Sequence, residues 1–120
     1  MAVFALAACF TFNLRQSLPG GYYLEGWQSG RDYTLGGPQY SADAGGVLAG
    51  SVERIGWNDS YIVAWRTPML ANEATGWMVV DVRTGALRGP MSDAALEILQ
   101  AAEPRLKGIV LKPPAEYFQK

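Results

Sequence analysis

The chain lacks histidine altogether and contains a single cysteine, Cys9, among its 120 residues. These absences exclude histidine-based zinc sites, thiol–histidine pairs, Ser-His-Asp triads and an internal disulfide bond. Acid–base chemistry is then left to carboxylates, and nothing in the spacing of Glu53, Asp59 and Asp81 forces any two of them together. We therefore assign no catalytic residue from the sequence.

Clusters of one charge are also missing. Ten basic residues balance eleven acidic ones, and neither sign forms a run of the kind that marks a nucleic-acid or anionic-membrane surface. The Asn-Asp-Ser group at 58–60 supplies too few oxygen donors for a calcium loop, and the glycine pairs lack the residues of a phosphate-binding loop. The sequence thus predicts no nucleic-acid partner, no metal and no cofactor.

The composition is that of one folded, strand-rich domain. Hydrophobic residues make up 49% of the chain and charged residues 18%, while 14 glycines and many aromatics favour strands and turns over a helical bundle. We expect an α+β fold, in which an antiparallel β-meander of about five or six strands carries one C-terminal helix on a face. The expected domain covers residues 21–112, between an apolar N-terminal segment with its tether (1–20) and an extended tail (113–120).

The clearest structural signal is VERIGWNDSYIVAWR, residues 52–66, in which two β-prone runs flank an Asn-Asp pair. A two-residue turn there pairs Ile55 with Ile62 on one face of a hairpin and Val52 with Trp65 on the other. Because both faces then carry apolar side chains, we expect the hairpin at the centre of the sheet.

One helix is predicted near the C-terminus, capped by Ser92 and ended by Pro104. Residues 108–111 are expected to add a last edge strand. The apolar residues expected to pack the helix on the sheet are Ala95, Leu96, Ile98, Leu99 and Ala102.

The longest apolar stretch, Met1 to Leu14, is uncharged and falls short of the roughly 20 residues that a membrane-spanning helix needs. Within it, Leu6-Ala7-Ala8-Cys9 resembles the bacterial lipobox, in which a lipid is attached to the cysteine before cleavage makes that residue the new N-terminus. The resemblance implies lipid attachment at Cys9. The alternative is that residues 2–12 pack against the domain and that Cys9 is a small buried hydrophobic side chain.

The whole chain is similar to small bacterial lipoproteins of unknown function, which pair a lipobox with a compact β-rich domain. The similarity includes a hairpin of the type Ile-Gly-x-x-x-x-Tyr-Ile-Val-Ala, here Ile55-Gly56 and Tyr61 to Ala64. The resemblance implies a location in the cell envelope and no particular activity.

Aromatic side chains are the best candidates for a binding surface, since tryptophans concentrate at sites that recognise sugars, peptidoglycan or proteins. The alternative is that at least two of the tryptophans fill the core of a small sheet. The residues of this candidate surface are Trp27, Trp57, Trp65, Trp77, Arg54 and Arg66.

Together these features predict a non-enzymatic domain on the periplasmic side of a bacterial membrane, anchored through Cys9, that binds a protein or a cell-wall component. The first alternative is a soluble inhibitor or immunity-type protein of the cytoplasm, with the N-terminal segment packed in the fold. The second is a small hydrolase that uses Asp81 or Glu53, which requires two carboxylates within about 5 to 10 Å in one pocket.

Overall fold

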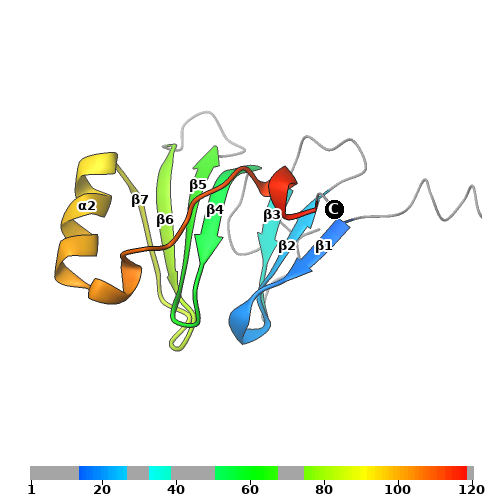
Figure 1. The fold of residues 1–120 in the computed structure, drawn as a ribbon, viewed down its shortest axis with the longest axis horizontal. Coiled ribbons are helices and arrows are strands. Elements are labelled where there is room, and N and C mark those ends of the chain that lie inside the picture. Colours follow the sequence, from blue (N-terminus) through cyan, green and yellow to red (C-terminus); the bar gives the residue numbers. More distant parts are fainter. Residues whose placement is uncertain (1–13, 27–32, 39–50, 68–74, 119–120) are drawn as a thin grey trace, which may run out of the picture.

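The computed structural model describes residues 14–26, 33–38, 51–67 and 75–118. These residues form two antiparallel sheets and an α-helix, arranged as successive layers in Figure 1. The three-stranded sheet contains β1 (Leu14–Ser17), β2 (Tyr23–Gly26) and β3 (Tyr33–Gly36), in the order β1-β2-β3. The four-stranded sheet contains β4 (Ser51–Trp57), β5 (Tyr61–Thr67), β6 (Gly76–Asp81) and β7 (Leu87–Met91), in the order β4-β5-β6-β7. The helical elements are α2 (Asp93–Ala102) and the short 3-10 helices η1 (Pro19–Gly21), η3 (Pro104–Leu106) and η4 (Pro114–Tyr117).

The α+β class is confirmed, but the single meander of five or six strands is wrong. The strands divide into sheets of three and four that pack face to face. Each sheet has an apolar face: Leu24 and Leu35 are fully buried in one, and Ile55 and Ile62 in the other. A lone helix covers one face of a single sheet, so packing two sheets together buries side chains that a continuous sheet would leave in water.

Two hydrophobic cores flank the four-stranded sheet. The first core lies between the two sheets, and the second lies between the four-stranded sheet and α2. Strand β5 contributes to both, because Ile62 and Ala64 enter the first core whereas Tyr61 and Val63 enter the second. The buried centre of the second core consists of Tyr61, Val63, Trp77, Val79, Leu96 and Leu106.

The hairpin of β4 and β5 is confirmed, but its register differs by two residues from the predicted one. Ile55 pairs with Ala64 where the short turn predicts Ile62. The cause is Asn58, whose Oδ1 accepts hydrogen bonds from the backbone N–H groups two and three residues on, each at 2.9 Å. This Asx turn lengthens the loop, and the hairpin is not central, since β4 is an edge strand of its sheet.

A β-bulge in β4 also changes the predicted face of Val52. Arg54 pairs with Trp65, but Val52 pairs with Arg66, so one extra residue separates the two pairs on β4. Val52 therefore enters the first core, on the face opposite to Trp65.

The predicted helix is confirmed, but only part of its predicted packing face reaches the sheet. The Ser92 hydroxyl accepts a hydrogen bond from the N–H of Ala95 at 3.1 Å, as an N-cap does. Leu96 is 5% exposed, whereas Ile98 is 72% exposed. At 3.6 residues per turn, Ile98 lies about 200° round the helix from Leu96, and one sheet cannot cover both.

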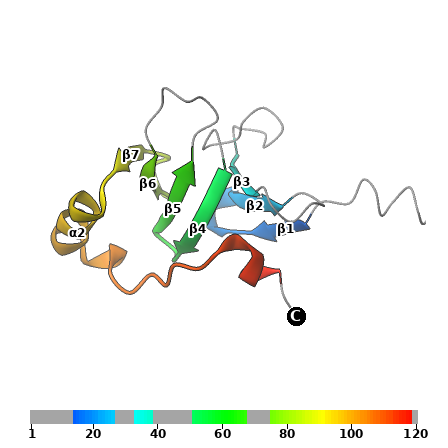
Figure 2. The ribbon, with the colours of Figure 1, turned by 90° about the horizontal axis from the view of Figure 1, so that it is seen from above.

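The C-terminal segment, residues 109–118, is a strap across the edge of β4 rather than an edge strand followed by an extended tail (Figure 2). It forms one antiparallel bridge, in which Ile55 and Lys112 exchange backbone hydrogen bonds of 2.9 and 3.0 Å. The ladder ends there because Pro113 and Pro114 have no N–H to donate, and Pro114 begins η4 instead.

This strap contacts both cores. Ile109 packs against the second core, and Tyr117 and Phe118 pack against the first. The Tyr117 ring lies 4.6 Å from the ring of Trp57, and its hydroxyl donates a hydrogen bond of 2.7 Å to the carbonyl of Ile55. Burial, aided by the charge of Glu116, raises the pKa of Tyr117 above its usual value of 10.0.

Candidate functional site

Part of the predicted aromatic surface is assembled in one open hollow on the helix-facing side of the four-stranded sheet. Trp65 and Trp77 lie there with Arg54, on three adjacent strands. The hollow has a volume of about 440 Å³. We call it the tryptophan hollow, and its lining consists of Glu53, Arg54, Trp65, Trp77, Asp93 and Pro113.

The register of the sheet brings its aromatic pair together. Trp65 pairs with Trp77 across β5 and β6, and their rings meet edge to face, with centroids 5.2 Å apart at 72°. Trp77 is 8% exposed and belongs to the second core, while Trp65 is half-buried. Trp65 therefore supplies the accessible indole, and the buried ring of Trp77 packs against it.

The polar side chains around this hollow already have partners within the fold. The Trp77 indole N–H donates to Asp93 Oδ1 at 2.6 Å, and Arg54 Nη2 donates to the carbonyl of Leu111 at 3.1 Å. The Thr67 hydroxyl donates to Glu53 Oε2. The rim is therefore held in place by the protein itself, and the hollow presents mainly apolar surface.

The other predicted surface residues lie elsewhere. Trp57 packs against Tyr117 of the strap with their rings tilted, at the opposite end of the β4–β5 hairpin from Trp65. Arg66 is 8% exposed and, by strand alternation, lies on the face opposite to Trp65. Trp27 and Cys9 lie outside the described residues.

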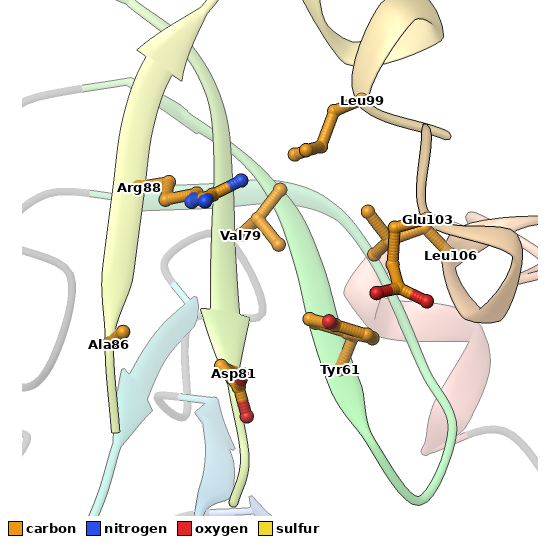
Figure 3. Close-up of a pocket in the computed structure, with 8 residues that line it drawn as sticks. All are labelled: Tyr61, Val79, Asp81, Ala86, Arg88, Leu99, Glu103 and Leu106. Carbon is orange, nitrogen blue, oxygen red and sulfur yellow. The ribbon is translucent and has the colours of Figure 1, made fainter. Parts of the chain in front are cut away.

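A second, more enclosed cavity of about 160 Å³ was missed by sequence reasoning (Figure 3). It lies on the helix-facing side of the four-stranded sheet, between strands β6 and β7 on one side and the C-terminal end of α2 with η3 on the other. No local pattern marks it, because its residues come from separate elements. We call it the tyrosine pocket, and its lining consists of Tyr61, Val79, Asp81, Ala86, Arg88, Leu99, Glu103 and Leu106.

Asp81, which lines this pocket, has a lowered pKa. Desolvation alone would raise its pKa, but hydrogen bonds from the backbone N–H groups of Arg83 and Thr84, together with the Arg83 charge, lower it below 3.8. The two N–H groups lie 2.9 and 3.3 Å from Oδ1. Asp81 is thus an ionised turn residue, and it lines a different cavity from Glu53, the other carboxylate of the hydrolase hypothesis.

Comparison of the chain with protein-family models, with curated proteins and with solved structures gave no match in any of the three. Across the described residues, no helix has the length and apolar character needed to cross a membrane, and no group of three or more acidic or cysteine side chains is placed to hold a metal ion. Function therefore has to be inferred from the geometry of the hollow and the pocket.

Proposed function

We propose that this domain is a non-enzymatic binding module that takes a segment of a partner protein in the tryptophan hollow. The observation that supports it most directly is the partly exposed indole of Trp65, which packs against the buried indole of Trp77 with ring centroids 5.2 Å apart. A rigid aromatic side chain on a buried support loses little conformational entropy on binding, and such residues dominate binding energy at protein interfaces.

A protein partner fits the hollow better than a cell-wall glycan does. The centre of the hollow is the apolar Trp65–Trp77 pair, and Arg54, Asp93 and Glu53 on its rim are each held by a hydrogen bond within the fold. An apolar side chain inserted beside Trp65 buries surface without breaking any of these bonds.

Site-specific photo-crosslinking tests this proposal. A benzophenone amino acid replaces Trp65 in cells, and the matched control carries the same group in place of Ile98, which is 72% exposed on the outer face of α2. We expect a discrete cross-linked protein from position 65 that position 98 does not give. The captured protein is then purified, and its affinity for the domain is measured directly.

In that binding measurement, Trp65→Ala should weaken affinity by about 30-fold, the typical effect of losing a central aromatic anchor. Arg54→Glu is the second variant, because Arg54 is exposed and contributes a single bond to the fold. Unchanged affinity in both variants contradicts the proposal. Sedimentation with purified peptidoglycan that depends on Trp65 would instead make the partner a glycan.

We further propose that the domain is attached to the bacterial envelope through a lipid on Cys9. The support is the lipobox-like sequence Leu6-Ala7-Ala8-Cys9. Labelled palmitate should enter the native protein and not its Cys9→Ala variant, and the mass of the N-terminal peptide should be that of an acylated cysteine. An intact Met1 in a cytosolic fraction would favour the soluble, immunity-type alternative.

A further inference from the structure

We propose that the tyrosine pocket is a binding site for a single free amino acid of small or medium size. The proposal is independent of the tryptophan hollow, because the two cavities share no lining residue. The pocket has an apolar interior and a charged rim. Its apolar interior consists of Val79, Ala86, Leu99 and Leu106.

Tyr61 places an unused hydrogen-bonding group in this interior. The residue is 9% exposed, and within the described part of the chain no group hydrogen-bonds its hydroxyl. The hydroxyl oxygen is not fully buried, so it is open to a hydrogen bond from outside the fold. A polar atom of a ligand in the pocket could take the place of water there.

Charges of both signs surround the interior. Figure 3 shows the Arg88 guanidinium and the Glu103 carboxylate on opposite sides of Val79 and Tyr61, with Asp81 near the ends of the strands. The Arg88 guanidinium makes no ion pair or hydrogen bond with the described residues, so its donors are available to a carboxylate. One side of the rim is therefore suited to an anion.

The side that carries Glu103 is suited to a cation. Glu103 is the C-cap of α2, and the last turn of that helix contains no basic residue. The partial negative charge of the helix C-terminus therefore adds to the carboxylate charge, and a cation there is stabilised by both. Asp81, held ionised by its turn, adds a further negative charge to the rim.

A ligand that matches this arrangement carries an ammonium group, a carboxylate and an apolar side chain. The ammonium faces Glu103 and the Tyr61 hydroxyl, the carboxylate faces Arg88, and the side chain packs on Val79 and Leu106. The cavity of about 160 Å³ lies below the range of about 300–1,000 Å³ that drug-sized ligands occupy. It is therefore sized for one amino acid rather than a peptide or a disaccharide.

Titration of the intact protein with the common free amino acids, followed by calorimetry and by NMR shifts of the pocket residues, tests this inference. The corresponding amines without a carboxylate and acids without an ammonium group should bind at least tenfold more weakly. Tyr61→Phe, which removes only the hydroxyl, should weaken binding about fivefold. Arg88→Gln and Glu103→Gln should each weaken it tenfold or more.

The matched controls are Arg105→Gln and Glu97→Gln, which change exposed residues that do not line the pocket and should leave affinity unchanged. Trp65→Ala should also leave it unchanged, which separates this site from partner binding. The inference is overturned if no amino acid shifts the pocket signals, if the amines bind as tightly as the amino acids, or if Tyr61→Phe and Arg88→Gln have no effect.

Discussion

At Asp81 a single carboxylate oxygen organises the turn that follows β6. Oδ1 accepts hydrogen bonds from the N–H groups of Arg83 and Thr84, and the N–H of Gly85 donates to the Asp81 carbonyl at 2.7 Å. These contacts explain both the lowered pKa and the sharp reversal of the chain into β7. An aspartate that sequence reasoning singled out for acid–base chemistry is thereby explained by local structure.

Asp81→Ala should lower the free energy of unfolding by about 1 kcal/mol near neutral pH, because two backbone N–H groups lose their acceptor. Since the folded pKa lies below the unfolded value of 3.8, the ionised carboxylate contributes fully above that value, and the contribution is lost as pH falls through the folded pKa. Urea unfolding of both proteins at about pH 7, 5 and 3 should show the difference shrinking only at the lowest pH.

The matched control is Asp59→Ala, which removes an exposed turn carboxylate with no side-chain bond among the described residues. Its cost should be within about 0.5 kcal/mol at every pH. A cost for Asp81→Ala that stayed constant down to the lowest pH would contradict this assignment.

Among the elements, α2 lies where the sequence predicts a helix, but only part of the face predicted to pack on the sheet does so. Ser92 caps the helix, as the sequence predicts. In the middle of the helix, however, Leu96 faces the sheet and Ile98 faces water. The Trp77 indole fixes the helix N-terminus through Asp93, so the bonding of a neighbouring strand helps to set the rotation of the helix. Helix packing is therefore decided by the surface beneath it.

Leu96→Ala and Ile98→Ala test this orientation on the same helix. Leu96 is 5% exposed, and its truncation should cost about 3 kcal/mol through lost burial and a residual cavity. Ile98 is 72% exposed, and its replacement should cost less than about 0.5 kcal/mol, because alanine also has the higher helix propensity. Equal losses in chemical denaturation would show that the helix presents a different face.

For the whole molecule, the strap formed by residues 109–118 ties the layers together. It begins beside the second core and ends on the first, where Phe118 stacks on Tyr33 with centroids 5.8 Å apart. Gly56 makes this path possible, since a Cβ at that position would collide with the carbonyl oxygen of Val110. The Ile-Gly pair of the hairpin thus has a structural role. The backbone of Ile55 hydrogen-bonds the strap, and the missing Cβ of Gly56 allows the strap to approach closely.

Gly56→Ala should therefore lower the free energy of unfolding by about 2 kcal/mol, because backbone atoms of the strap must shift to make space. Gly108→Ala is the control. No atom lies within 4 Å of its added Cβ, and its φ of +81° adds a backbone cost of about 1–2 kcal/mol without moving the strap.

Thermal unfolding gives the two stabilities, and NMR shifts of Tyr117 and Phe118 report whether the strap has moved. Only Gly56→Ala should change those shifts. A Gly56→Ala protein with unchanged stability and unchanged strap signals would contradict the close approach.

Short-range patterns were enough to predict the β4–β5 hairpin, the helix at Asp93–Ala102 and the α+β class. They also selected Trp65, Trp77 and Arg54, which the structure brings together, because tryptophans on β-prone runs are candidates for a binding face whatever the register. The structure does not place Trp57 and Arg66 in this hollow, since the surroundings of a side chain depend on which strand and strap lie beside it.

By itself, the sequence located the β4–β5 hairpin and α2, and its lack of histidine and of a second cysteine excluded histidine-based sites and an internal disulfide, because these depend on residue type and local spacing. Only the tertiary structure decided that the strands divide into two sheets, that the Asn58 turn lengthens the hairpin, and that Tyr61, Arg88 and Glu103 line one pocket. The physical reason is burial: apolar faces are covered by whichever surfaces fit them, and those surfaces come from parts of the chain that are far apart in sequence.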